Sequence, residues 1–203
     1  MPNIALIKED GMPLVVPAGS IHAILKASNQ LGAPDTRAMV CYEFRGFSFA
    51  AVVDASEDVF TAMLNNLNPD QQEVLGESAW LMLDALPPLK EARIEVSAEE
   101  AKQQLGDDIT IENPEGEAPA VLGTLSFELP DSLEPVGKTY IRKSIFRGYE
   151  GFKSRHTPTG ALLELPKGYG MLKLNLQLGD NFAADFCALT ANNLAQLNAC
   201  DLA

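Results

Sequence analysis

The chain has 203 residues, of which 46% are apolar, and a formal net charge of −13 at pH 7. This length and apolar content suffice for a full hydrophobic core in one large or two small domains, and they exclude a wholly disordered chain. No run approaches the roughly 18–20 apolar residues of a membrane helix, and the first residues lack the basic and apolar regions of a secretory signal. The 3 cysteines, widely spaced, fit reduced thiols, so we expect a cytoplasmic protein.

The charge is unevenly distributed along the chain. Residues 54–135 carry 19 acids and 3 bases. Residues 138–156 have the opposite character, with Glu150 as their single acid among six basic residues: Lys138, Arg142, Lys143, Arg147, Lys153 and Arg155. This segregation predicts two differently charged surfaces, each suited to a different partner.

Turn dipeptides and alternation predict the first elements. Residues 3–8 and 13–16 flank an Asp-Gly turn and predict a hairpin. Ser20 then has the properties of an N-cap, which predicts a helix from Ile21 to about Gly32 with His22 as a structural residue in its first turn. Residues 38–53 alternate around Arg45-Gly46 and predict the strongest hairpin of the chain.

Helical signals dominate residues 54–86. A capping box of Asp54 and Glu57 precedes an apolar stripe at helical spacing, which predicts a helix through Leu67. Asn68-Pro69 predicts the start of a second helix, running to Leu86 and closed by two prolines. Residues 92–96 predict a short strand, and 97–106 a short helix.

The remaining chain reads mostly as strand. The acidic, turn-rich residues 107–119 predict an exposed loop, and any division of the chain would fall there, between 1–106 and 120–203. Strands are predicted at 120–129, 136–147, 161–165 and 170–178, followed by a helix from about 190 to 200, while 182–189 fits strand or helix. We therefore expect a single α+β domain with a helix-rich first half containing hairpins and a strand-rich, antiparallel second half, possibly ending in a short helix.

Two stretches of the chain have the same order of predicted elements. Residues 38–67 and 170–200 share the order strand, tight turn, strand, helix. No residue-level repeat accompanies this order, and the sequence alone favours chance.

No motif of enzyme chemistry is present. The sequence lacks the glycine-rich nucleotide loops, the nucleophile elbow and the spacing of a zinc site, and it contains only His22 and His156. We expect neither a cofactor nor a metal. The composition instead favours a non-enzymatic binding, adaptor or inhibitor protein.

The basic segment supplies the first candidate binding residues. Cationic groups suit phosphates and exposed rings suit unstacked bases, so residues 138–156 predict a contact with single-stranded nucleic acid or an acidic protein partner. The residues concerned are Lys138, Arg142, Lys143, Arg147, Tyr149, Phe152, Lys153 and Arg155. The same charges could instead only balance the acidic half of the molecule.

The acidic half supplies the second candidate surface. Glu95, Glu99, Asp107 and Asp108 predict a protein-binding face that could imitate a phosphate backbone and engage a basic protein or a nucleoprotein complex.

Two other classes of function stay open. One is an enzyme that binds an anionic small molecule through Arg142, Arg147 and Arg155, with His156 as proton carrier. The other is a structural assembly subunit. No membrane partner is expected, and the oligomeric state is open.

Overall fold

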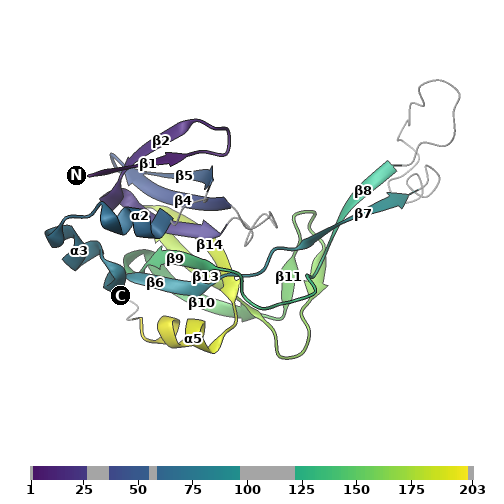
Figure 1. Cartoon of the computed structure of the whole chain (residues 1–203). Coiled ribbons are helices and arrows are strands. Elements are labelled where there is room, and N and C mark those ends of the chain that lie inside the picture. The colour runs from purple at the N-terminus through teal and green to yellow at the C-terminus, as the bar shows by residue number, and fades with distance from the viewer. Residues whose placement is uncertain (1, 27–36, 55–58, 97–121, 201–203) are drawn as a thin grey trace, which may run out of the picture.

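The computed structural model describes residues 2–26, 37–54, 59–96 and 122–200 (Figure 1). Most of the described chain is antiparallel β-structure. The strands are β1 (Asn3–Ile7), β2 (Pro13–Pro17), β3 (Ile21–Lys26), β4 (Arg37–Phe44), β5 (Phe47–Asp54), β6 (Trp80–Asp84), β7 (Lys90–Val96), β8 (Leu122–Glu128), β9 (Lys138–Arg142), β10 (Phe146–Phe152), β11 (Ser154–His156), β12 (Leu162–Glu164), β13 (Met171–Leu178) and β14 (Asn181–Ala188). The α-helices are α2 (Val59–Asn65), α3 (Pro69–Leu75) and α5 (Ala191–Asn198), and the 3₁₀ turns are η1 (Ala18–Ser20), η2 (Glu77–Ala79) and η3 (Lys143–Ile145).

Two sheets form the body of the molecule. One has five strands in the order β5-β4-β3-β9-β6, and the other has three in the order β10-β13-β14. One face of the five-stranded sheet packs against the β1–β2 hairpin and α2, through buried residues that include Ile4, Val40 and Met63. Its other face packs against the three-stranded sheet and α5, with Leu81, Leu174 and Leu197 among the buried residues. The five-stranded sheet therefore lies between two hydrophobic cores.

The predicted helix-rich first half is wrong. Residues 21–26, expected to begin a helix, form β3, and the expected helix to Leu86 stops at Leu75 and is followed by β6. Strands β3 and β6 each contribute side chains to both cores. Their sequences are therefore short apolar runs without clear alternation, and such a run also fits a buried helix. Ser20 ends η1, and its hydroxyl donates to the carbonyl of Pro17 over 2.8 Å. Mixed α and β structure is the part of the expectation that stands.

Other expected elements are present. The hairpins β1–β2 and β4–β5, the strand at 92–96 within β7, and the C-terminal helix α5 are confirmed, and 182–189 falls largely in strand β14. Asn68 caps α3 in a capping box with Gln71. Glu57, the predicted helix at 97–106 and the acidic loop at 107–119 lie outside the described residues.

The same order of elements occurs twice in the fold. The first unit is β1-β2-η1-β3-β4-β5-α2, and the second is β6-β9-η3-β10-β13-β14-α5, with the ribbons β7–β8 and β11–β12 inserted. The pairing of strands within each unit has the same irregularity. In β3, Ile21 pairs with Tyr42 of β4, and the register shifts after this pair. In β10, Phe146 pairs with Leu176 of β13, and the register again shifts after the pair. The shared order of residues 38–67 and 170–200 is therefore part of a repeat of topology, and the expectation of chance is wrong.

Two ribbons leave the body on the same side. The β7–β8 ribbon projects far from the sheets, and the short β11–β12 ribbon lies beside its base (Figure 1). Both are insertions in the second unit, so they give one side of the molecule a surface that the first unit lacks.

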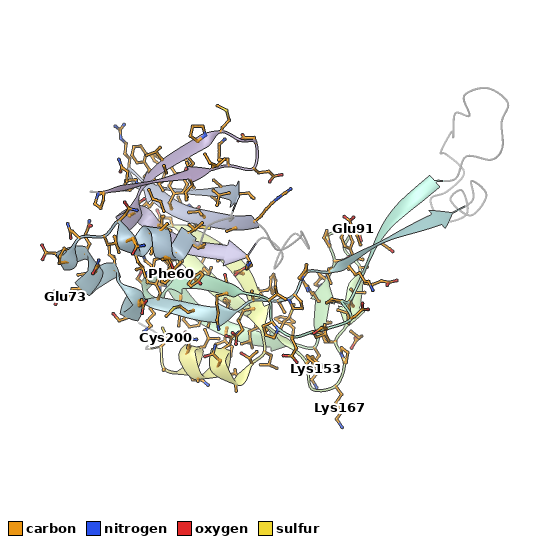
Figure 2. The ribbon with its side chains drawn as sticks, viewed as in Figure 1. Phe60, Glu73, Glu91, Lys153, Lys167 and Cys200 are labelled. Carbon is orange, nitrogen blue, oxygen red and sulfur yellow. The ribbon has the colours of Figure 1, made fainter. Side chains whose placement is uncertain are left out.

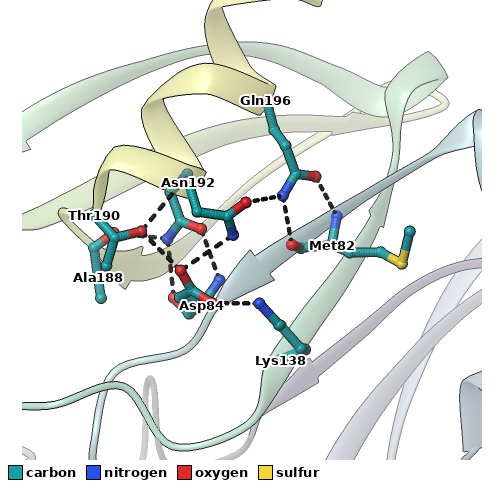
Figure 3. A network of polar contacts seen from close by, with 8 residues as sticks. Met82, Asp84, Lys138, Ala188, Thr190, Asn192 and Gln196 are labelled. Atoms are coloured by element: carbon teal, nitrogen blue, oxygen red, sulfur yellow. Dashed lines mark hydrogen bonds and ion pairs between the residues drawn. The ribbon is translucent and has the colours of Figure 1, made fainter.

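Helix α5 closes the edge of the five-stranded sheet at β6 (Figure 3). The side-chain amide of Gln196 accepts from the backbone N–H of Met82 over 2.9 Å and donates to its carbonyl over 2.8 Å. Asn193 makes the same pair of bonds with the backbone of Asp84, at 2.7 and 3.0 Å. Two amide side chains one helical turn apart thus act as a substitute strand for this edge.

The Asp84 carboxylate anchors the same network. It accepts hydrogen bonds from Thr190, over 2.8 Å, and from Asn192, over 3.1 Å, and it pairs with Lys138. Burial raises the pKa of Asp84, but these hydrogen bonds outweigh burial and hold the pKa below its ordinary value. Lys138, a predicted anion-binding residue, therefore forms an ion pair with Asp84 of its own chain.

Candidate functional site

A pocket of about 200 Å³ opens beside the base of the two ribbons. Five separate segments line it: residues 86–87 after β6, 133–135 before β9, Arg155 of β11, Leu165 with residues 168–170 before β13, and residues 188–190 from the end of β14 to the start of α5. Because these segments are distant in the sequence, only the tertiary fold assembles the pocket.

Most of the pocket wall is apolar. Leu86, Leu133, Pro135 and Leu165 line it, while Tyr169 and Leu189 are 44% and 40% exposed. A cavity of about 150 Å³ holds a benzene molecule, whereas small-molecule sites usually occupy about 300–1,000 Å³. The pocket therefore has the size for one apolar side chain or a similarly small ligand.

Two charged residues line the pocket, Glu134 and Arg155, and Arg155 is the buried one. Its side chain is buried, and its Nη1 donates to the carbonyl of Pro87 over 2.6 Å. Burial lowers the pKa of Arg155 to about 10, so the guanidinium stays charged at neutral pH. Neighbours along a strand point to opposite faces, and His156 is exposed outside the pocket. The structure thus does not bring His156 and Arg155 together as an acid–base pair.

Two other arginines of the basic segment are held within the fold. Arg142 is buried, its Nη2 donates to the carbonyl of Gly19 over 2.8 Å, and its guanidinium lies 5.2 Å from the ring centroid of Trp80. Burial lowers the pKa of Arg142 to about 10. Arg147 donates to the carbonyls of Ser144 and Phe146 and to the side chain of Gln177. Both arginines stabilise turns and strands of their own chain.

The remaining residues of the segment do not gather at one place. Tyr149 donates its hydroxyl to Asn198 of α5 over 2.8 Å, and Phe152 is 36% exposed. The seven residues of β10 separate the two ends of the segment by about 20 Å. Exposed Lys143 lies before β10, and exposed Lys153 follows it.

The predicted acidic surface is mostly beyond the described chain. Glu95 belongs to β7, and Glu99, Asp107 and Asp108 lie outside the described residues. The structure therefore leaves this surface as a prediction.

Sequence reasoning missed the pocket. The sequence marks Arg155 as part of a basic segment and Pro87-Pro88 as a helix stop, and neither pattern indicates that the two lie against each other. The apolar residues of the wall come from loops, where no periodic pattern marks them.

The polar groups of the pocket do not form a catalytic set. They are Arg155, Glu134, Tyr169 and Thr190, and the Thr190 hydroxyl already donates to Asp84. Across the described ranges, no group of three or more metal-ligating side chains is present.

Comparison with protein-family models, with curated proteins and with solved structures found no match for this chain. None of the helices in the described ranges is long and apolar enough to cross a membrane.

Proposed function

We propose that the protein is a non-enzymatic binding or adaptor protein whose pocket at Arg155 takes one apolar side chain of an acidic protein partner. The observation that carries this proposal is the pocket itself, which combines apolar walls with one buried guanidinium in a volume of about 200 Å³. Interfaces commonly depend on one or two such anchor side chains buried in a pocket.

The charge around the pocket favours an acidic partner. Residues 153–169 carry Lys153, Arg155 and Lys167 against one acid, Glu164, and Glu134 is the one acidic residue that lines the pocket itself. Figure 2 shows Lys153 and Lys167 at the same end of the molecule, near the β11–β12 ribbon. A carboxylate next to the apolar anchor of the partner would meet this positive region.

The aromatic residues favour a protein partner over single-stranded nucleic acid. Stacking of bases needs exposed rings. Phe146 is buried, Tyr149 is half-buried and bonded to α5, and Tyr140 stacks on Phe60 at 4.2 Å. Within residues 138–156, Phe152 alone among the aromatic residues is classed as exposed.

A titration with minimal probes tests the pocket. N-acetyl-phenylalanine carries one ring and one carboxylate, and at about 0.3 kcal/mol for each of its roughly 15 heavy atoms it should bind with a Kd near 1 mM. Amide NMR shifts should change at Tyr169, Gly170 and Leu189. N-acetyl-phenylalaninamide, which lacks the carboxylate, should bind several-fold more weakly.

Two leucine variants provide the control for this titration. Leu189→Glu places a carboxylate on the pocket rim and should abolish the shifts, whereas Leu162→Glu changes a leucine that is 53% exposed on the ribbon and does not line the pocket. The proposal fails if the free acid leaves the pocket amides unmoved, or if both variants weaken binding equally.

A further inference from the structure

The pocket lies at the base of the β7–β8 ribbon. Residues 86–87 of its wall come just before β7, and residues 133–135 follow β8. The pair Val96–Leu122 marks the opposite end of the ribbon, which is the end farthest from the body (Figure 1). The ribbon has 7 paired positions, which set its two ends about 20 Å apart.

The ribbon stands clear of the body of its own chain. Among the described strands, β7 and β8 pair only with each other. Figure 1 shows both strands extending away from the two main sheets. A two-stranded ribbon without further packing is at best marginally stable in water. A second molecule that packs along the ribbon would therefore stabilise it.

The far end of the ribbon carries an acidic segment, residues 97–121, which connects Val96 to Leu122 and lies outside the described residues. The segment contains 7 acidic residues and 1 basic residue. Its large apolar residues are Leu105, Ile109, Ile111 and Val121. Ile109 is 13 residues from each end, and carboxylates flank the two isoleucines on both sides, at Asp107, Asp108 and Glu112. The acidic segment thus combines an apolar side chain with nearby negative charge.

We propose that the acidic segment of one copy of the chain occupies the pocket of a second copy, with Ile109 or Ile111 as the apolar anchor. This inference rests on the proposed function, because it specifies the partner of the same pocket. An isoleucine side chain has fewer carbon atoms than benzene, so it fits a pocket of about 200 Å³. The neighbouring carboxylates then meet Lys153 and Lys167 outside the pocket.

A two-fold axis makes this contact reciprocal. Two ribbons that lie side by side in opposite directions place the far end of each at the base of the other. Because the pocket is at the base and the acidic segment is at the far end, such a dimer contains the contact twice. The arrangement also covers both ribbons. A segment that instead ran back into the pocket of its own chain would leave the ribbon uncovered.

Charge complementarity favours this occupant. The acidic segment has a net charge of −6, and it meets residues 153–169, in which three basic residues accompany one acid. Glu134 in the pocket wall does not repel the anchor, because the side chain that enters is uncharged. Charges on the rest of the two bodies oppose the dimer little, since charges farther apart than about 8 Å are largely screened at physiological salt.

Sedimentation of the full chain measures the dimer. Two contacts with a Kd on the order of 0.1–1 mM each, held at a millimolar effective concentration, give a dimer constant of about tens of micromolar. The native chain should therefore sediment as a dimer at about 200 μM. Ile109→Ser combined with Ile111→Ser removes the anchor and should give a monomer.

Leu105→Ser is the matched control for sedimentation, because it changes an apolar residue of the same segment that is not the anchor. This variant should remain a dimer. A monomeric native chain overturns the proposal and would include the case of a segment bound to its own pocket. Loss of the dimer in Leu105→Ser equal to that in the isoleucine variant also overturns it.

Amide NMR on mixed variants assigns the contact to the pocket. The labelled chain carries Ile109→Ser with Ile111→Ser, so its pocket is intact. The unlabelled chain carries Leu189→Glu, so its acidic segment is intact while its pocket is blocked. Mixing the two chains should shift the amides of Tyr169, Gly170 and Leu189 in the labelled chain.

An unlabelled chain with all three substitutions is the control for this mixture, and it should cause no shifts. The proposal is overturned if neither unlabelled chain shifts the pocket amides, or if both shift them equally.

The phenylalanine probe separates this inference from the proposed function. N-acetyl-phenylalanine is titrated into the labelled chain that carries Ile109→Ser and Ile111→Ser. Shifts of the pocket amides together with a monomeric native chain would retain the proposed function and overturn the dimer. Absence of these shifts would overturn the proposed function and this inference with it.

Discussion

Phe60 shows how much one buried ring contributes to stability. It is 5% exposed, packs edge to face on Trp80 at 5.4 Å and stacks on Tyr140 at 4.2 Å. Phe60→Ala should lower the free energy of unfolding by about 3–5 kcal/mol, because it leaves a cavity between α2 and the sheet. Urea denaturation measures this loss. Phe182→Ala, at a position that is 79% exposed, should stay within about 0.5 kcal/mol of the native protein.

His22 gives the stability of the fold a pH dependence. Burial lowers the pKa of His22 below the ordinary value of 6.5, Arg142 lowers it further, and Glu43, 3.6 Å away, acts against both. In the unfolded chain the imidazole takes up a proton near pH 6.5, which the folded state resists. Stability should therefore be unaffected by His22 above that pH and fall as the pH drops below it.

Comparison of two histidine variants measures this effect. The difference in urea midpoint between pH 7.5 and pH 5.5 should shrink in His22→Gln. His156→Gln changes a histidine at an exposed position and controls for the loss of an imidazole. An equal change in both variants would contradict the role assigned to burial at His22.

Among the elements, those marked by turns were predictable and those marked by burial were not. Asp10-Gly11 and Arg45-Gly46 fix two hairpins because their backbone conformations suit few other residues, with φ of 78° at Gly11 and 81° at Gly46. β3 and β6 contribute to a core on each face, so their side chains carry no period that separates a strand from a helix. The pocket was unpredictable for a related reason, since its walls meet only through tertiary structure.

The contact between α5 and β6 can be tested at the level of these two elements. Gln196→Met keeps the length of the side chain and removes both of its bonds to the backbone of Met82. Unfolding free energy should fall by about 1–3 kcal/mol, and hydrogen exchange of the Met82 amide should accelerate. Asn192→Ala, on the same helix, loses contacts to side chains only and should leave that exchange rate unchanged.

At the scale of the molecule, the two topological units are joined by shared structure. β9 belongs to the second unit, yet it pairs with β3 of the first inside the five-stranded sheet. Tyr140 of β9 also stacks on Phe60 of α2. The five-stranded sheet is built from strands of both units, so the repeat does not divide the chain into two independent domains.

We therefore expect one cooperative unfolding transition, which the single tryptophan can report. Trp80 lies in the core of the β1–β2 hairpin and α2, whereas Leu174 is fully buried in the opposite core. Leu174→Ala should cost about 2–5 kcal/mol. In a cooperative molecule, this cost shifts the urea midpoint seen by Trp80 fluorescence as much as the midpoint seen by circular dichroism. If the two cores unfolded separately, the Trp80 midpoint would stay in place while the circular dichroism transition split in two.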